Sequence, residues 1–152
     1  MLYFIKVNCF ILIYFSIFDS SVYIVRNDAV LQEVPMIIRE IQSLLKARIL
    51  EGEAQLDHTV SEAFASDMMS DVLAYASPHS ALLTGLCNPQ VIRTAEMMDM
   101  PCIIFVQGKS PGLEALALAG ERDICILQTS LDMFCACGIL YTHGLPGGGA
   151  HE

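Results

Sequence analysis

Three short apolar runs decide the fold: ALLTGL at residues 81–86, CIIFV at 102–106 and ICIL at 124–127. Each run is followed by a turn and then by a helical stretch, at nearly even spacing. The runs are apolar on both faces, which is typical of parallel strands covered by helices and not of half-exposed hairpin strands. Alternation of strand and helix predicts right-handed crossovers. We therefore expect a small three-layer α/β fold with a mostly parallel sheet flanked by helices.

The turns between these runs carry residues that start and stop helices. Asn88-Pro89 places a capping side chain before a proline at the first helical position, and Ser110-Pro111 repeats this arrangement. Ser130 predicts the cap of the helix after the third run, and Gly120 predicts the end of the helix before that run.

The stretch that precedes the three runs has a looser pattern. Apolar residues at helical spacing after Met36 predict a short first helix, and a short strand follows at 47–50. Alternation predicts another strand at 60–66. Asp67 and Ser70 are both candidate caps of the next helix.

The charge balance argues against nucleic acid as a partner. The 152 residues include 8 Lys and Arg against 17 Asp and Glu, which gives a formal charge of −9 and a pI of about 4.7. A phosphate backbone is bound by clustered cations, which such a surface cannot supply. Hydrophobic residues at 54% fit one compact domain and exclude a disordered chain.

The first 35 residues differ in composition from the rest. Four of the seven Phe lie within the first 18 residues, whereas all ten Gly lie from Gly52 onward. Three interpretations stay open: translated sequence upstream of a start at Met36, a membrane anchor, or a signal peptide or true structure. The apolar run at 2–18 is shorter than the about 20 residues that a membrane helix needs. We expect residues 36–145 to form the α/β domain and residues 146–152 a flexible tail.

The loops after the three runs define a candidate ligand site. Ligands of open parallel sheets collect beyond the carboxyl ends of the strands, where helix N-termini converge. Hydroxyl, amide, glycine and lysine residues at that edge are able to hold an anion, although ordinary turn and cap residues give the same pattern. The candidates are Thr84, Gly85, Asn88, Gln107, Gly108, Lys109, Ser110, Thr129 and Ser130.

No signature of catalysis, metal binding or cofactor binding accompanies these candidates. Gly108-Lys109-Ser110 is not a P-loop, because position 103 is Ile where that motif needs Gly. The close glycines at 147–149 precede no helix, and the histidines are dispersed. We therefore predict no catalytic residues, no metal site and no cofactor, which favours a binding module over an enzyme.

The cysteines favour packing over chelation. Cys102 and Cys125 fall inside predicted strands, where a thiol behaves as a small apolar side chain. Cys135 and Cys137 project about 200° apart on a helix, so they cannot readily bind one metal ion. Without a CxxC pair, an iron–sulfur cluster would need ligands from distant strands. Unpaired thiols indicate a reducing compartment, so we expect a cytoplasmic protein, with a membrane anchor only if residues 1–35 are real.

Two carboxylates form the remaining candidate site. Asp67 and Asp71 lie four residues apart on a predicted helix and could share one face with Ser70, as an acidic patch for Mg²⁺. Interaction with the helix dipole is the simpler explanation of both residues.

Most of the chain from Met36 resembles the stand-alone DRTGG domain proteins. The likeness lies in IQSLL at 41–45, ASDMMSDVLA at 65–74, LTGLCNPQVIRTA at 83–95 and FVQGKSP at 105–111, and it continues through 129–134 and Gly138. The Asp-Arg-Thr-Gly-Gly string itself is missing, with GLCNP at 85–89 in the corresponding loop. Roles of charged residues in that loop of relatives therefore do not carry over.

The resemblance implies an α/β domain similar to the N-terminal domain of HPr kinase/phosphorylase, which also occurs in some phosphotransacetylases and in a CBS-domain pyrophosphatase, at subunit contacts. It implies a regulatory role of unknown biochemistry and a homodimer. Small stand-alone versions occur in anaerobic bacteria near iron hydrogenase genes, and some carry the name iron-sulfur binding hydrogenase. The cysteine spacing here does not support a cluster of the chain's own.

Two functional hypotheses follow. The first is a non-catalytic, dimeric regulatory module that senses a small anionic or nucleotide-like ligand at the strand ends and reports to a partner such as a kinase. The second is an enzyme, or an accessory or iron–sulfur-related protein, of an iron hydrogenase system that uses Asp67, Asp71, Lys109 and the thiols.

Overall fold

The computed structural model describes residues 3–7, 11–15, 22–26 and 35–148, and it divides into two compact units, Met1–Gln32 and Glu33–Glu152. In the first unit, three strands form an antiparallel sheet in chain order. Among the described residues, no helix combines the length and apolarity needed to cross a bilayer. The three interpretations of residues 1–35 stay open. The strands are β1 (Tyr3–Val7), β2 (Ile11–Phe15) and β3 (Val22–Arg26).

The second unit is built on a five-stranded sheet with the order β5-β10-β9-β8-β7. The three apolar runs form β8, β9 and β10, and these strands are parallel to one another, as predicted. The parallel part is extended by β7, and β5 lies antiparallel to β10 at the opposite edge. The bounds are β5 (Arg48–Glu51), β7 (Ala63–Ala65), β8 (Ala81–Thr84), β9 (Cys102–Phe105) and β10 (Cys125–Gln128).

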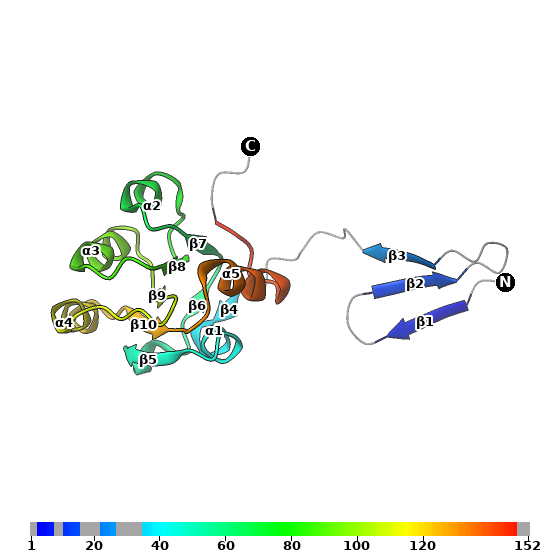
Figure 1. Cartoon of the computed structure of the whole chain (residues 1–152), viewed down its shortest axis with the longest axis horizontal. Coiled ribbons are helices and arrows are strands. Elements are labelled where there is room, and N and C mark those ends of the chain that lie inside the picture. The colour runs from blue at the N-terminus through cyan, green and yellow to red at the C-terminus, as the bar shows by residue number, and fades with distance from the viewer. Residues whose placement is uncertain (1–2, 8–10, 16–21, 27–34, 149–152) are drawn as a thin grey trace. The chain divides into compact units, whose positions relative to one another are not determined.

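Helices cover both faces of this sheet, which confirms the three-layer prediction (Figure 1). Leu83 and Ile104 face α1 and α5, whereas Leu82 and Ile103 face α2, α3 and α4. All residues of β8 and β9 are buried, which explains why the runs are apolar on both faces. The helices are α1 (Ile38–Leu44), α2 (Met69–Tyr75), α3 (Pro89–Met97), α4 (Leu113–Glu121) and α5 (Met133–Thr142).

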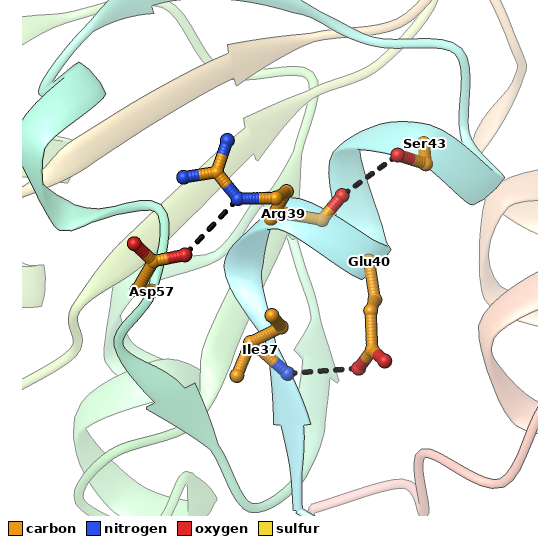
Figure 2. A network of polar contacts seen from close by, with 5 residues as sticks. All are labelled: Ile37, Arg39, Glu40, Ser43 and Asp57. Atoms are coloured by element: carbon orange, nitrogen blue, oxygen red, sulfur yellow. Dashed lines mark hydrogen bonds and ion pairs between the residues drawn. The ribbon is translucent and has the colours of Figure 1, made fainter.

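Side-chain contacts fix the start of α1 (Figure 2). The Glu40 carboxylate accepts a hydrogen bond of 3.1 Å from the Ile37 N–H, which satisfies one of the free donors at the helix start. Arg39 Nε lies 3.0 Å from Asp57 Oδ1, and this exposed ion pair ties the helix to the loop before β6. The Ser43 hydroxyl donates to the Arg39 carbonyl at 2.9 Å.

The stretch 60–66, predicted as one strand, is divided between two sheets. Val60 belongs to β6 (Thr59–Val60), which pairs with β4 (Met36–Ile37), and residues 63–65 form β7 beside β8. The division has a physical cause, because the Glu62 carbonyl accepts a hydrogen bond of 2.8 Å from the Ala81 N–H. This bond joins the chain to β8 directly after β6, so the following residues pair at the edge of the five-stranded sheet and not with β4.

The predicted boundaries of α4 are wrong at both ends. Gly112, and not Ser110, is the N-cap residue, because the preceding turn is held to a neighbouring loop and Pro111 is buried. Gly120 does not stop the helix, which continues to Glu121. A Cβ at Gly120 would lie 3.3 Å from Glu51 Cδ, so this glycine permits close packing of the helix on β5.

The caps of the neighbouring helices differ in the same way. Asp132, and not Ser130, caps α5, and its carboxylate accepts a hydrogen bond of 2.8 Å from the Cys135 N–H. Asn88 is the N-cap residue of α3 with Pro89 at its first position, as predicted, but the Asn88 side chain makes no capping hydrogen bond.

Part of the segment expected to be a tail is hydrogen-bonded to β7. The Ala63 N–H donates to the Pro146 carbonyl at 2.9 Å, and the Gly148 N–H donates to the Ala63 carbonyl at 2.7 Å. Residues 146–148 therefore pair with the edge of β7. Residues 149–152 lie outside the described residues, and their flexibility stays a prediction.

A substitution of Gly52, the residue after β5, tests the close packing of the chain against β10 at this point. Gly52 has φ of 77°, and an added Cβ would lie 2.8 Å from Cys125 Cα, which is backbone and cannot turn away. We expect Gly52→Ala to lower the free energy of unfolding by about 1–3 kcal/mol, measured by urea denaturation.

Gly138→Ala is the matched control for this substitution. Gly138 is exposed within α5, with no atom within 4 Å of an added Cβ. This variant should gain about 0.5–1 kcal/mol through helix propensity. Equal stability of Gly52→Ala and the native protein would contradict the proposed close approach of Gly52 and β10.

Candidate functional site

The carboxyl ends of β8, β9 and β10 lie in one row. Thr84 pairs with Phe105, and Phe105 pairs with Gln128, so the three strands end at the same level. The loops that follow these strands therefore open at one edge of the sheet, as the sequence predicted.

The loop after β8 holds a carboxylate from a different loop. Asp67 Oδ1 accepts a hydrogen bond of 2.6 Å from the Gly85 N–H and another of 2.8 Å from the Thr84 hydroxyl. The Thr84 oxygen in turn accepts from the Leu86 N–H at 3.1 Å. Thr84 is buried and Asp67 is exposed, so the carboxylate reaches the rim of the sheet from the solvent side.

Asp67 thus lies at the candidate site and does not cap α2. The N-cap residue of α2 is Met68, whose N–H donates to the Ser66 hydroxyl at 3.0 Å. The Gly85 N–H, above all, and then the Thr84 hydroxyl and the positive charge of Lys109 hold the pKa of Asp67 below its usual value. The carboxylate is therefore ionised at neutral pH.

Lys109 approaches the same glycine from the loop after β9. An added Cβ on Gly85 would lie 2.9 Å from Lys109 Nζ and 3.5 Å from Asp67 Oδ2. The described residues contain two ion pairs, Arg39–Asp57 and Arg122–Glu96, and Lys109 takes part in neither. The absence of a side chain at Gly85 therefore leaves room for an ammonium group beside the Asp67 carboxylate.

The turn that carries Lys109 is clamped by the neighbouring loop. Gln107 and Gly108 have φ of 60° and 66°, and their N–H groups donate to the carbonyls of Leu131 and Thr129 at 2.7 Å and 2.8 Å. Gln128 Nε2 donates to the Gly108 carbonyl at 2.9 Å. These bonds fix the turn and leave the two N–H groups occupied.

The structure thus divides the nine predicted site residues into three sets. Thr84, Gly85 and Lys109 come together around Asp67. Gln107, Gly108 and Thr129 serve the loop structure, and the Thr129 hydroxyl donates to the Leu45 carbonyl at 2.8 Å. Asn88, Ser110 and Ser130 are exposed, and their side chains make no hydrogen bond within the described part of the chain. The ligand role of all nine stays a prediction.

Cys87 is a neighbour of this cluster that the sequence did not single out. Its Sγ lies 3.7 Å from the Gly85 carbonyl oxygen, and its side chain is half-buried. Partial burial raises the pKa of the Cys87 thiol, with the charge of Lys109 acting in the opposite direction. The thiol is therefore protonated at neutral pH and is a poor nucleophile.

The other cysteines and carboxylates do not gather into a metal site in the described residues. Cys102 and Cys125 pair across β9 and β10 and are core residues, as predicted. Within residues 35–148, no group of three or more His, Cys, Asp or Glu side chains is placed to hold a metal ion. Cys9 lies outside the described residues.

A shallow groove of about 650 Å³ lies elsewhere, along β5. Gln42 and residues 47–53 line it, and none of them is a predicted site residue. The groove therefore offers no enclosure for the polar cluster around Gly85.

Comparison with known proteins identifies the class of fold. No family model and no curated protein matches the chain. A solved structure that does resemble it is the CBS and DRTGG domains of the regulatory region of Clostridium perfringens pyrophosphatase, complexed with the activator diadenosine tetraphosphate. The TM-score is 0.59 at 17% sequence identity, over 72% of this chain and 47% of that one.

The α/β unit therefore has a DRTGG-like fold. The chain spans about half the length of the pyrophosphatase regulatory region. At this sequence identity the likeness establishes the fold alone. The more specific similarity to the N-terminal domain of HPr kinase/phosphorylase stays a prediction.

The Asp67 contacts predict a pH dependence of stability. Folding lowers the pKa of Asp67, so the ionised Asp67 carboxylate stabilises the folded state fully above its unfolded pKa of about 3.9. This stabilisation is lost as the pH falls through the lower pKa of the folded state. We expect Asp67→Asn to reduce stability at pH 7 by about 1 kcal/mol or less, since the side chain is largely exposed. The difference from the native protein should shrink below pH of about 4, measured by urea denaturation.

Asp71→Asn is the matched control for this pH series. It removes the same charge four residues away, from a side chain that has no hydrogen bond or ion pair within residues 35–148. Its effect on stability should be smaller than that of Asp67→Asn, because Asp71 interacts with the dipole of α2 but accepts no hydrogen bond from any described residue. A loss for Asp67→Asn that stays constant down to pH 2 would contradict the assignment of an ionised carboxylate.

Proposed function

We propose that the α/β unit is a non-catalytic regulatory module that binds a small anionic, nucleotide-like ligand at the carboxyl ends of β8 and β9. The observation that carries the proposal is the convergence of the Gly85 N–H, the Thr84 hydroxyl and the Lys109 ammonium. A backbone N–H, a hydroxyl and an ammonium together form a donor set suited to a phosphate or carboxylate oxygen.

Two neighbouring helix starts add to the positive potential at this edge. The N-cap residues of α3 and α4 are Asn88 and Gly112, and neither helix has a side-chain cap. Pro89, the first residue of α3, has no N–H, so the backbone donors at the two helix starts begin at Gln90 and Leu113, with no capping side chain to occupy them. The helix dipoles favour negative charge near both starts. The dipoles support anion binding in general and do not select a particular ligand.

The chemistry of the cluster favours binding over catalysis. Cys87 is the thiol next to it, and its pKa is raised by burial. Asp67 is ionised but already accepts two hydrogen bonds, which makes it a weak base. The regulatory character is supported by the fold, since the similar pyrophosphatase segment is a regulatory region complexed with a nucleotide activator.

Several narrower expectations stay predictions. Homodimerisation and a kinase or hydrogenase partner rest on the family resemblance, and light scattering at micromolar concentration tests the dimer. A cytoplasmic location likewise stays a prediction. The iron hydrogenase association would gain support from a protein that is coloured and contains iron after anaerobic purification.

Substitution of Lys109 tests the proposed site. We expect at least one of ATP, ADP, diadenosine tetraphosphate and pyrophosphate to raise the melting temperature of the native protein. Lys109→Met should weaken binding of that ligand by about 10-fold to 100-fold, because one charge-assisted hydrogen bond is lost. Isothermal titration calorimetry measures both affinities.

Two further variants make the test specific. Arg122→Met also removes one positive charge, from an exposed ion pair at the far end of α4, and should leave affinity nearly unchanged. Gly85→Ala would place its Cβ 2.9 Å from Lys109 Nζ, so it should displace the ammonium and weaken binding without unfolding the chain. No stabilisation by any of the four ligands would overturn the proposed function.

A further inference from the structure

We propose that Asp67 is an intramolecular substitute for the anionic group of the ligand. Its carboxylate occupies the Gly85 and Thr84 donors, and an incoming phosphate or carboxylate group binds by displacing it. The displacement releases the segment that leads into α2. This inference rests on the proposed function and adds to it a mechanism of regulation at the same site.

The contacts of Asp67 are those expected of a bound anion. A single oxygen, Oδ1, accepts both the 2.6 Å bond from the Gly85 N–H and the 2.8 Å bond from the Thr84 hydroxyl. The donors lie 17 and 18 residues away in the sequence, so the bonds join the segment before α2 to the end of β8 and the loop after it. A carboxylate held by a backbone N–H and a hydroxyl therefore fills the place that a ligand oxygen needs.

Lys109 lies beside this carboxylate without being paired to it. Its Nζ and both Asp67 oxygens lie within 3.6 Å of the position of an added Cβ on Gly85, yet Lys109 takes part in neither ion pair of the described residues. An incoming anion would gain the ammonium as a partner in addition to the two donors. A ligand with more than one anionic oxygen can therefore outcompete the carboxylate, which uses one oxygen for both bonds.

The segment that carries Asp67 is lightly anchored. The seven-residue helix α2 has Val72 as its buried residue, and the side chain of its N-cap residue, Met68, makes no capping hydrogen bond. The Met68 N–H donates to the Ser66 hydroxyl at 3.0 Å, within the same segment. The nine-residue α3 buries four residues. A short helix with few buried contacts requires little free energy to shift. The Ser66 N–H is hydrogen-bonded to the Leu83 carbonyl of β8 at 3.1 Å, so the anchored part of the chain ends there. Displacement of Asp67 would therefore move residues 67–69 and α2 before any other element at this edge.

The released carboxylate also has to leave the site. If it stayed beside the bound ligand, two negative groups would share one set of donors, and their repulsion would oppose binding. Ligand binding and movement of the Asp67 loop are therefore coupled. The fraction of molecules in which the donors are free sets the apparent affinity.

Removal of the carboxylate gives a direct test. ATP, diadenosine tetraphosphate and pyrophosphate are titrated by calorimetry into the native chain, Asp67→Ala and Asp71→Ala. Asp67→Ala should bind at least one probe about tenfold more tightly than the native chain, because no displacement is needed. Asp71→Ala removes the same charge from α2 and should change affinity by less than about threefold, which reports the general charge effect.

A second measurement uses the native chain and does not depend on the stability of a variant. On addition of the tightest-binding probe, the backbone amides of residues 67–72 should exchange hydrogen for deuterium faster, while those of β8 and β9 stay protected. Faster exchange in this segment supports displacement, and unchanged or slower exchange contradicts it.

The outcomes separate this inference from the proposed function. Failure of the native chain and of Asp67→Ala to bind any probe overturns both. Binding by the native chain with no gain for Asp67→Ala over Asp71→Ala overturns the displacement alone. Binding by the native chain that becomes about tenfold tighter in Asp67→Ala, and not in Asp71→Ala, supports the displacement, because only the Asp67 carboxylate then competes with the ligand.

Discussion

Burial of both faces of β8, β9 and β10 is the constraint on which the rest of the structure depends. Strands with apolar side chains on each face need a helical layer on each side. Parallel strands can be joined only by crossovers, so each strand is followed by a helix that returns along the sheet. The loops after Thr84, Phe105 and Gln128 then have to open at the same edge. The polar cluster is a consequence of this core.

The architecture could be predicted because its signal is local in the sequence. Each apolar run is short, continuous and bounded by turn residues, and the buried strands match the runs closely. The same reasoning located Thr84, Gly85 and Lys109 near one another, since it requires only that parallel strands end together. The predictions of Ser110 and Ser130 as helix caps were wrong. Hydrogen bonds between the two loops, such as that from the Gln107 N–H to the Leu131 carbonyl, hold these residues in the loops, so both helices begin further along the chain.

Asp67 could not be assigned to the cluster from sequence for a related reason. Its position before an apolar helical stretch is explained locally by a helix cap or by the helix dipole. Its actual partners, Thr84 and Gly85, belong to another strand–helix unit. No spacing rule connects residues 17 or 18 positions apart across two parallel strands. The contact depends on β7 lying beside β8, which the sequence predicted only as part of a longer strand at 60–66.

The position of the Asp67 carboxylate, between the end of β8 and α2, explains how a small domain with a rigid core could transmit a signal. The core layers around β8 and β9 are fully buried, so binding at the strand ends cannot deform them cheaply. The loop of Asp67 and α2 lies outside that constraint, because Val72 is the helix's buried residue. Met68, Leu73 and Tyr75 of this segment are 62%, 42% and 59% exposed, so a shift of α2 changes an apolar surface. An anion that competes with the Asp67 carboxylate would thus alter the exposed apolar surface of α2, to which a second protein can bind.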